Sequence, residues 1–319
     1  MWNLFFACVT VFFGVMLLTP PIGAVAWKIG AVDVPKDARR MHKESVPRSG
    51  GVAIFLALLA GCVGFCTMDP FLLRILIGAT LLTMIGLLDD IYSIRPLGKL
   101  LAQIGAAVIG VYGASLGVVL WSSFWVVAVT NAHNFIDGID GLFAGCASVE
   151  SIVLAGLLFL FGQESLALPC VLIFVACLAF RSFNSHPAMI FAGDCGSGTV
   201  GYLLGMLSLP LFWEMRWEAG WLSPLFLFAY PLTDLFTSVV RRILRGNSPF
   251  HADRGHIHHR ICATGIGQIA CGRILIFLSA LGALVAAFLS TGGDLIAASL
   301  SCVVAAVFLI EIRTLFYCI

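Results

Sequence analysis

Long apolar runs dominate the sequence, and short polar segments interrupt them. A run of about 20 apolar residues can cross a bilayer as a helix, because a segment in lipid must satisfy its own backbone hydrogen bonds. About eleven runs qualify, at residues 4 to 27, 51 to 67, 72 to 88, 100 to 114, 117 to 131, 142 to 161, 166 to 181, 198 to 213, 220 to 240, 274 to 291 and 295 to 310. The pattern predicts an all-α polytopic membrane protein of about 11 transmembrane helices, in one domain over residues 1–319.

The stretch from residue 100 to 130 carries no charge and is too long for one span of about 20 residues. We divide it at residues 113–117, which read Gly-Ala-Ser-Leu-Gly. Sixteen of the 18 Lys and Arg residues then fall on one side of the membrane, and the other two are Arg74 and Arg216. Because cytoplasmic loops carry the excess of positive charge, we expect the N-terminus outside and the C-terminus in the cytoplasm.

Composition supports a membrane protein and excludes other classes. Hydrophobic residues make up 60% of the chain and charged residues only 11%, whereas a soluble fold needs about 25% charged residues. The net charge of +1 offers nothing that would attract nucleic acid. The first residues lack the basic segment of a signal peptide, so the first apolar run is expected to be a spanning helix. Most of the 11 cysteines lie in apolar runs without CxxC spacing, which favours helix packing over a disulfide framework.

Carboxylates cluster where apolar runs end on the predicted cytoplasmic side. Asp89 and Asp90 end one run, and Lys99 follows ten residues later. A charged residue costs about 2.5 to 3.5 kcal/mol at mid-bilayer and less near the interface, so an adjacent pair favours a magnesium site or a base over a merely solvated helix end. Asp194 lies in a glycine-rich turn before a helix, which suits cation or diphosphate binding. The GxGxxG pattern that follows Asp194 is a weak nucleotide signal, because no strands surround it.

A second acidic segment runs from Asn131 to Gly141. If it is helical, Asn131, Asn134, Asp137 and Asp140 share one face, and their oxygen and amide groups could hold Mg²⁺ or the edge of a nucleobase. Two acids lie inside apolar runs. Glu150 is expected to face the bundle interior, and Asp234 near the cytoplasmic end is a candidate for supporting the site; neither is assigned as catalytic.

Basic residues and histidines fill two further segments. Arg48 lies in Pro-Arg-Ser-Gly-Gly at residues 47–51, where the glycines allow a close approach to another chain or an anion. Residues 248–260 carry four histidines interleaved with Arg254 and Arg260. Zinc is an alternative there, but cysteine partners and the spacing of known zinc motifs are absent. A diphosphate suits the mixture of histidine and arginine better.

Five motifs in a fixed order resemble a known family: DVPxxxRxxH with PRSGG, LLDD with PLxKL, NAxNFxDGxDGL, GDxGSxxxG and ADRxHIHHR. They span Asp33 to Arg260 and are similar to those of the polyprenyl-phosphate N-acetylhexosamine-1-phosphate transferases, which include phospho-N-acetylmuramoyl-pentapeptide transferase. The ADRxHIHHR form is similar to the branch that transfers N-acetylglucosamine (GlcNAc) 1-phosphate, because the pentapeptide branch carries three consecutive histidines after a proline. The chain departs from the family at Ala192, commonly methionine, and at His133, commonly apolar.

The resemblance implies a reaction: a UDP-N-acetylhexosamine and a polyprenyl phosphate, such as undecaprenyl phosphate, give a polyprenyl diphosphate-linked sugar and UMP, with Mg²⁺ as cofactor and Mn²⁺ as a substitute. It also implies residue roles. The expected catalytic residues are Asp89, Asp90, Asp137 and His256. The expected substrate-binding residues are Lys99, Asn131, Asn134, Asp140, Arg254, His258, His259 and Arg48. The expected magnesium ligands are Asp194 and Asp90.

Several alternatives stay open at this point. Within the enzyme class these are the muramoyl-pentapeptide donor and a different N-acetylhexosamine, and outside it a secondary transporter. Transporters place ionisable groups near the midplane, whereas the acids and histidines here gather at one face. The acceptor phosphate, with a second pKa near 6, is largely dianionic at pH 7, which favours direct attack over a covalent aspartyl-phosphate. The expected location is the bacterial plasma membrane with a cytoplasmic active site, and a homodimer is one open assembly state.

Overall fold

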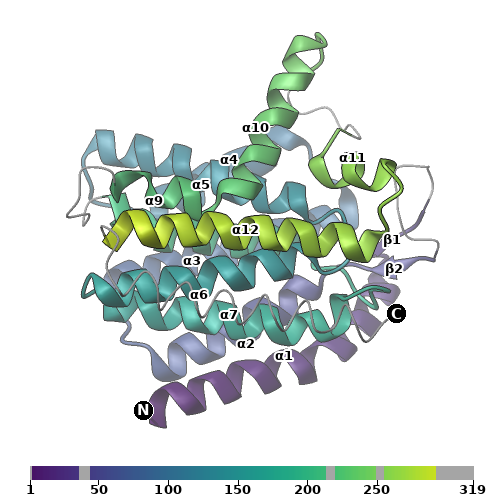
Figure 1. Cartoon of the computed structure of the whole chain (residues 1–319). Coiled ribbons are helices and arrows are strands. Elements are labelled where there is room, and N and C mark those ends of the chain that lie inside the picture. The colour runs from purple at the N-terminus through teal and green to yellow at the C-terminus, as the bar shows by residue number, and fades with distance from the viewer. Residues whose placement is uncertain (1, 36–43, 213–219, 249–254, 292–319) are drawn as a thin grey trace.

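The computed structural model describes residues 2–35, 44–212, 220–248 and 255–291. Within them, a pair of short antiparallel strands, β1 (Val32–Asp33) and β2 (Val46–Pro47), accompanies a bundle of helices (Figure 1). The helices are α1 (Trp2–Ile29), α2 (Gly50–Phe65), α3 (Pro70–Tyr92), α4 (Pro96–Gly110), α5 (Leu116–Ile136), α6 (Leu142–Leu160), α7 (Glu164–Asn184), α8 (Asp194–Leu207), α9 (Ser223–Leu227), α10 (Ala229–Leu244), α11 (Ile257–Ala263) and α12 (Gln268–Thr291), with short 3-10 turns η1 (Leu209–Phe212) and η2 (Gly220–Leu222).

Seven of the described helices are long and apolar enough to cross a membrane: α1, α3, α5, α6, α7, α8 with η1, and α12. Two shorter apolar helices, α2 and α4, accompany them. The polytopic all-α prediction is therefore confirmed, whereas the number of spans and the sides of the two termini stay predictions. The expected span at residues 295 to 310 lies outside the described residues.

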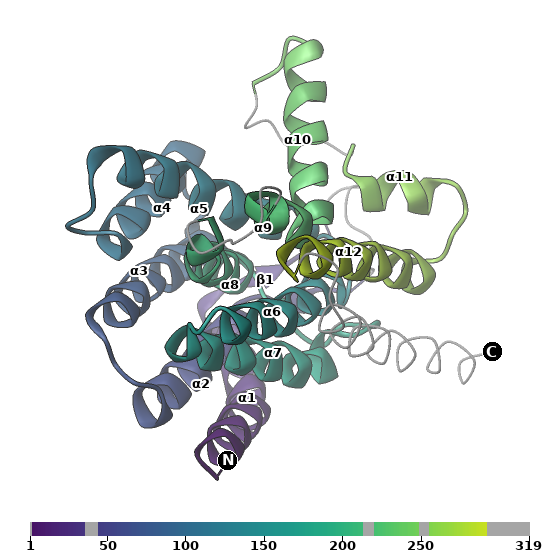
Figure 2. The same ribbon diagram turned by 60° about the vertical axis from the view of Figure 1, so that its left-hand side comes forward.

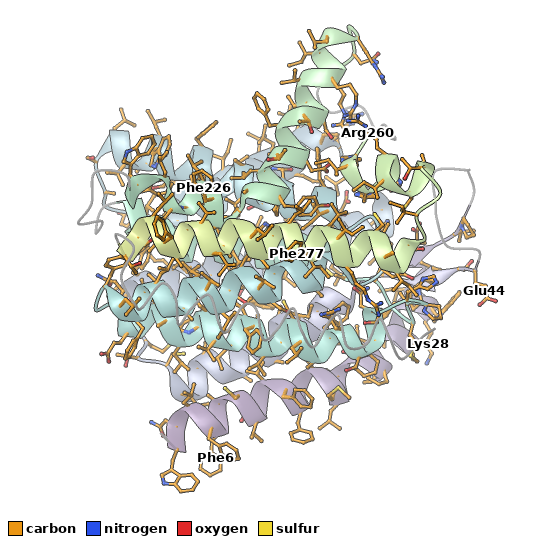
Figure 3. All side chains as sticks on the ribbon, viewed as in Figure 1. Phe6, Lys28, Glu44, Phe226, Arg260 and Phe277 are labelled. Atoms are coloured by element: carbon orange, nitrogen blue, oxygen red, sulfur yellow. The ribbon has the colours of Figure 1, made fainter. Side chains whose placement is uncertain are left out.

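The bundle is built around α6 and α8, whose side chains are largely buried. Helices α12, α6, α7 and α1 run roughly parallel across the molecule (Figure 1). Helix α1 lies at the periphery, and its Phe6 points away from the bundle (Figure 3) and is 50% exposed. Large apolar side chains on an outer surface are what contact with lipid tails requires, since lipid is as apolar as the protein core.

The uncharged stretch from residue 100 to 130 forms two helices, as predicted. Helix α4 ends at Gly110, Gly113 adopts the left-handed φ of +89°, and α5 begins at Leu116. Glycine reaches this φ without the clash that a Cβ would bring. Because the turn sends α5 back along α4, the two helices pack against each other and the segments at their far ends lie together.

The prediction of one continuous span over residues 220 to 240 is wrong. The chain forms η2 and α9, breaks at Phe228, and continues as α10, which projects away from the bundle (Figures 1 and 2). Pro231 explains the break: it has no N–H to donate to the carbonyl of Leu227, so the helix restarts with the bond from the Leu232 amide to the Phe228 carbonyl.

Glycines let α2 and the beginning of α8 meet backbone to backbone at the polar end of the bundle. The amides of Gly50 and Gly51 donate to the carbonyls of Phe191 and Ala192, at 2.9 Å each. A Cβ on Gly51 would lie 2.1 Å from the backbone of Gly196. The PRSGG segment thus contacts another part of the chain rather than only solvent, and it holds the glycine-rich turn before α8 in place.

We expect Gly51→Ala to lower the melting temperature of the detergent-solubilised protein by several degrees. Its Cβ would meet backbone atoms that cannot rotate away, and such overpacking costs about 1–3 kcal/mol or more. Gly64→Ala is the matched control on the same helix, because a Cβ there has no atom within 4 Å. Equal melting temperatures for the two variants would contradict this account of the contact.

Candidate functional site

Asp90 ties the end of α3 to the beginning of α8. Its carboxylate oxygens accept hydrogen bonds from the backbone N–H groups of Asp194 (3.0 Å) and Cys195 (3.3 Å). The Arg48 Nε lies 3.7 Å from the same carboxylate, and the Asp90 side chain has no exposed surface. Since the residue before α8 is Gly193, which has no side chain for capping, Asp90 satisfies the first amides of this helix from another element.

Lys99 joins the other two carboxylates of the cluster. Its ammonium lies 3.1 Å from the Oδ2 of Asp89 and also pairs with the Oδ2 of Asp194. Asp89 is held in turn by the Ile94 amide, which donates to its Oδ1 at 2.6 Å. The Nδ2 of Asn134 approaches Asp194 at 3.3 Å. The structure therefore brings α3, α4, α5 and α8 together around the Lys99 ammonium, and four of the predicted site residues, Asp89, Lys99, Asn134 and Asp194, lie side by side there.

The two asparagines of the acidic segment have different partners. Asn134 accepts a hydrogen bond from the Ser197 hydroxyl at 2.8 Å, which fixes its amide beside Asp194. Asn131 lies a turn earlier and donates to the Gln103 side chain at 2.7 Å. Asn134 therefore belongs to the carboxylate cluster, whereas Asn131 joins α5 to α4 at its edge.

The acidic segment is helical only as far as Ile136, where α5 ends, so the condition for one shared face is met by Asn131 and Asn134 alone. Gly138 and Gly141, the latter with a φ of +73°, turn the chain toward α6. Asp140 consequently faces the loop after α7, where its Oδ2 accepts hydrogen bonds from His186 Nδ1 (2.7 Å) and the Ala188 amide (3.2 Å). Asp137 and Asp140 thus lie at the site without sharing a helical face.

Asp137 occupies the most negative part of the site. Loss of contact with water raises the pKa of its carboxyl well above the usual range. The nearby charges of Asp194, Asp90 and Asp140 raise this pKa further, whereas Arg48 opposes them. A carboxyl with a raised pKa holds a proton more readily, which is the property expected of an acid–base group.

His256 is oriented by Asp234, a residue on α10. The buried Asp234 accepts a hydrogen bond from His256 Nδ1 at 2.7 Å and another from the Ile257 amide at 2.6 Å. The proton is therefore assigned to Nδ1, and Nε2 is left facing Arg242, whose Nη2 lies 3.5 Å away. Asp234 supports the site, as the sequence suggested.

His258 is buried among other rings, and only 1% of its surface is exposed. Its ring stacks on that of His256 at 5.5 Å and lies 4.3 Å from that of His259. Neither ring nitrogen has a hydrogen-bond partner among the described residues. Burial, and then the charges of His259 and His256, lower the pKa of His258 to about 3, and Asp234 opposes them.

This pKa predicts a loss of stability in mild acid. Below the ordinary value of 6.5 the unfolded chain takes up a proton on His258 that the folded chain refuses, so stability falls from pH 6.5 toward 3. Between pH 7 and 5, the free energy of unfolding should fall by about 2 kcal/mol more in the wild type than in His258→Gln. Unfolding with SDS in mixed micelles measures it, and parallel curves for the two proteins would refute the burial of a neutral imidazole.

Glu150 faces the bundle interior, as predicted, and pairs there with His133. The Nδ1 of His133 must carry a proton, because its partner is the carbonyl of Val129, which only accepts (2.8 Å). One further proton is then shared between His133 Nε2 and Glu150 Oε2 at 2.7 Å, while Ser279 donates to the other oxygen at 2.8 Å. The pair is neutral overall wherever that proton lies, which suits a membrane interior. The pair anchors α5 to α6 at His133, the residue before Asn134.

The donor set around Lys99 fits a hard cation. Mg²⁺ is usually held by one or two carboxylates together with substrate phosphates, not by a cage of protein ligands alone. Asp89 and Asp194 already converge on one positive charge, and a cavity of about 20 Å³, lined by Lys99, Asn134 and Asp194, adjoins them. Among the described residues, no group of three or more His, Cys, Asp and Glu could hold a metal by itself. Zinc at the histidines thus gains no support from the described chain.

Some site residues could not be singled out in the sequence. His186 and Asn184, at the end of α7, anchor the turn after α5: Asn184 accepts a bond from the Gly141 amide at 3.1 Å. Gln103 holds Asn131. Each of these three is an ordinary polar residue whose only signal is proximity to a motif, whereas Ser197, which holds Asn134, belongs to the GDxGSxxxG motif itself. The predicted Arg254 lies outside the described residues.

Comparison of the sequence with known proteins identifies the family to which this site belongs. Residues 72–211 match glycosyl transferase family 4. A probable undecaprenyl-phosphate N-acetylglucosaminyl 1-phosphate transferase of Bacillus subtilis (strain 168) is 34% identical over 277 residues, covering 80% of this chain and 76% of that protein. The decaprenyl-phosphate N-acetylglucosaminephosphotransferase of Mycobacterium tuberculosis (strain H37Rv) is 31% identical, covering 77% and 72%.

The undecaprenyl-phosphate alpha-N-acetylglucosaminyl 1-phosphate transferase of Escherichia coli (strain K12) is 32% identical over 268 residues, covering 76% of this chain and 71% of that protein. These similarities extend over most of both chains, well beyond the motifs. The chain therefore belongs to glycosyl transferase family 4, among the polyprenyl-phosphate N-acetylglucosamine-1-phosphate transferases.

Proposed function

We propose that this protein transfers GlcNAc-1-phosphate from UDP-GlcNAc to undecaprenyl or another polyprenyl phosphate, releasing UMP. The observation that carries the proposal is the convergence of Asp89 and Asp194 on the ammonium of Lys99, at the end of apolar helices. A lipid phosphate and a soluble nucleotide can meet only near the membrane surface. The names of the relatives support both the lipid and the sugar.

Magnesium is the cofactor we propose, with Mn²⁺ as a substitute. Asp194 and Asp89 would hold it. Asp90 would be a further ligand if its oxygens bound the cation in addition to the backbone amides of Asp194 and Cys195. A bound divalent cation would supply charge neutralisation to the donor diphosphate. Lys99 and Arg48 bring further positive charge to the same place, and both lie beside the carboxylates that would otherwise repel a phosphate.

The acceptor phosphate acts directly on the donor. One of its oxygens forms a bond to the β-phosphorus of the UDP-sugar, the bond from that phosphorus to the bridging oxygen breaks, and UMP leaves with the bond's electrons. A dianionic phosphate needs no proton removed, so Asp89 helps to orient the acceptor instead of forming a phosphoenzyme. His256, held by Asp234, is placed to hold a phosphate oxygen.

The proposed site faces the cytoplasm of a bacterial plasma membrane. Sixteen of the 18 basic residues were assigned to one side, with Arg74 and Arg216 on the other. The site residues Arg48, Lys99 and His256 belong to the basic side. This distribution supports an orientation in which UDP-sugars reach the carboxylate cluster from the cytoplasm.

One experiment tests the donor. Purified protein in detergent, with undecaprenyl phosphate and Mg²⁺, receives UDP-GlcNAc, UDP-GalNAc or UDP-MurNAc-pentapeptide in separate reactions, and UMP release is followed. We expect UDP-GlcNAc to react at least tenfold faster than the others. Faster release from the pentapeptide donor would reassign the protein within the family, and solute flux without UMP in proteoliposomes would favour a transporter.

A further inference from the structure

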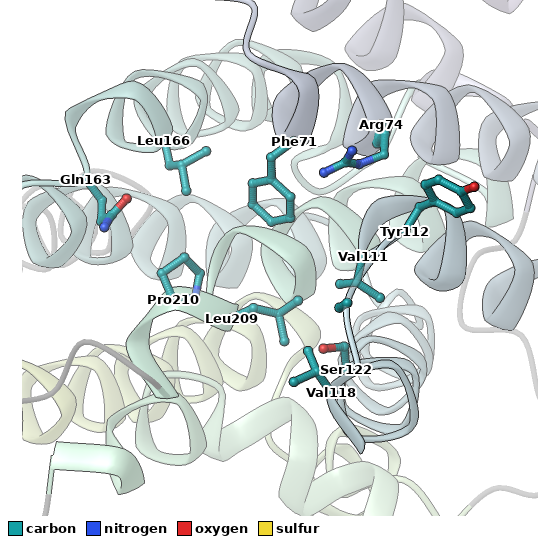
Figure 4. Close-up of a pocket in the computed structure, with 11 residues that line it drawn as sticks. Phe71, Arg74, Val111, Tyr112, Val118, Ser122, Gln163, Leu166, Leu209 and Pro210 are labelled. Atoms are coloured by element: carbon teal, nitrogen blue, oxygen red, sulfur yellow. The ribbon is translucent and has the colours of Figure 1, made fainter. Parts of the chain in front are cut away.

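A second cavity lies at the opposite end of the bundle, which we call the distal end. It measures about 440 Å³, is open to the surface, and lies between the beginnings of α3, α5 and α7, the turn after α4, and η1 (Figure 4). Its walls are mostly apolar, with Phe71, Leu166, Leu209 and Pro210 among them. Pockets that bind small molecules typically have about 300–1,000 Å³, so this one is large enough for part of a lipid.

Arg74 supplies a positive charge to the wall of this cavity. Among the described residues it is the one basic side chain at the distal end, about 24 Å along α3 from Asp90. Its Nε donates to the Gly110 carbonyl at 3.3 Å, which aligns the guanidinium beside the turn after α4. No carboxylate of the described chain pairs with it, so the remaining guanidinium donors are available to an anion.

Ser122 provides an independent sign of a ligand. The residue is fully buried, lines the cavity, and its hydroxyl has no hydrogen-bond partner among the described residues (Figure 4). A buried hydroxyl without a partner costs about 1–3 kcal/mol, so such a group usually has a partner. Gln163, on the opposite wall in the same view, adds an amide that can donate or accept.

We propose that the distal cavity binds an anionic phospholipid. The phosphate would pair with the Arg74 guanidinium, and the glycerol oxygens would reach Ser122 and Gln163. The first carbons of an acyl chain would fill the space between Phe71, Leu166 and Leu209. The exposed Tyr112, which also lines the cavity, continues the wall to the outer surface, where a lipid tail has to lie.

A free anion explains the cavity less well. A free phosphate bound by one guanidinium among apolar side chains would lose water that the protein does not replace with hydrogen bonds. A phospholipid offsets this cost, because its acyl chain gains free energy from contact with the apolar walls. A neutral lipid would bring Arg74 no counter-charge. The combination of one cation, two amide or hydroxyl groups and an apolar chamber therefore matches an anionic headgroup that carries a tail.

Native mass spectrometry of the delipidated full-length protein tests the proposal. The probes are dioleoyl phosphatidylglycerol, dioleoyl phosphatidylcholine and inorganic phosphate. We expect the wild type to bind phosphatidylglycerol at least fivefold more tightly than phosphatidylcholine. Arg74→Gln should remove this preference. Val118→Phe, which narrows the cavity from a half-buried position, should weaken the binding of both lipids. Arg95→Gln removes the same charge from an exposed position at the other end and should change nothing.

Three outcomes would overturn the proposal. They are an unchanged lipid preference in Arg74→Gln, equal binding of the two lipids by the wild type, and saturation by inorganic phosphate that displaces phosphatidylglycerol. Melting temperatures without lipid show whether each variant folds, and Arg74→Gln leaves the apolar walls intact. UMP release is measured separately, so a failure here leaves the proposed transferase function untouched.

Discussion

Asp194→Asn should lower UMP release at saturating UDP-GlcNAc by about a thousandfold, which corresponds to about 4 kcal/mol of transition-state stabilisation. The carboxylate pairs with the Lys99 ammonium and receives the Asn134 amide. It is also the proposed magnesium ligand. Asparagine keeps the shape but loses the charge, so Lys99 retains only Asp89 as its counter-ion and the cation for the donor diphosphate loses its principal anchor.

The control for this variant is Glu164→Gln, which removes a carboxylate from an exposed position at the first turn of α7, away from the site. It should retain the wild-type rate. Melting temperatures establish that both variants fold, and Asp89→Asn provides a second test because Asp89 shares Lys99 without contacting the α8 amides. Rates within threefold of the wild type for both Asp194→Asn and Asp89→Asn would refute the assigned roles.

The carboxylate cluster could be predicted because each of its members stands at the end of an apolar run. Asp89, Lys99, Asn134 and Asp194 all lie within about one turn of a helix end, and in a bundle of antiparallel helices the ends on one side lie close together. Family motifs then assigned the chemistry. What the motifs could not indicate was that Asp90 caps α8, since this contact depends on glycines 51, 86 and 196 bringing separate backbones together.

The features that could not be predicted arise from long-range packing. The break at Phe228 lies in an apolar run whose composition suits one long span, and only the missing N–H of Pro231 opposes it. The distal cavity is lined by four segments separated in sequence, and the contact of Asp140 with His186 depends on where α5 stops. Hydrophobic periodicity locates a helix, but it does not say which neighbour the helix will contact.

Asp234 extends this argument, because its role follows from the break before α10. We expect Asp234→Asn to lower kcat for UMP release by about a hundredfold while the KM for UDP-GlcNAc changes little. An asparagine has one acceptor oxygen for two donors, the His256 ring and the Ile257 amide, and its NH₂ group would face one of them. His256 would then lose the hydrogen bond that fixes its tautomer and its orientation.

A double-mutant cycle distinguishes this positioning role from a general loss of stability. If Asp234 acts through His256, adding Asp234→Asn to His256→Gln should lower kcat by less than threefold further, whereas two independent effects would multiply. Asp69→Asn, which keeps the cap of α3 at the distal end, should retain wild-type kcat. Losses in kcat that multiply in the double mutant would show that Asp234 does not act through His256.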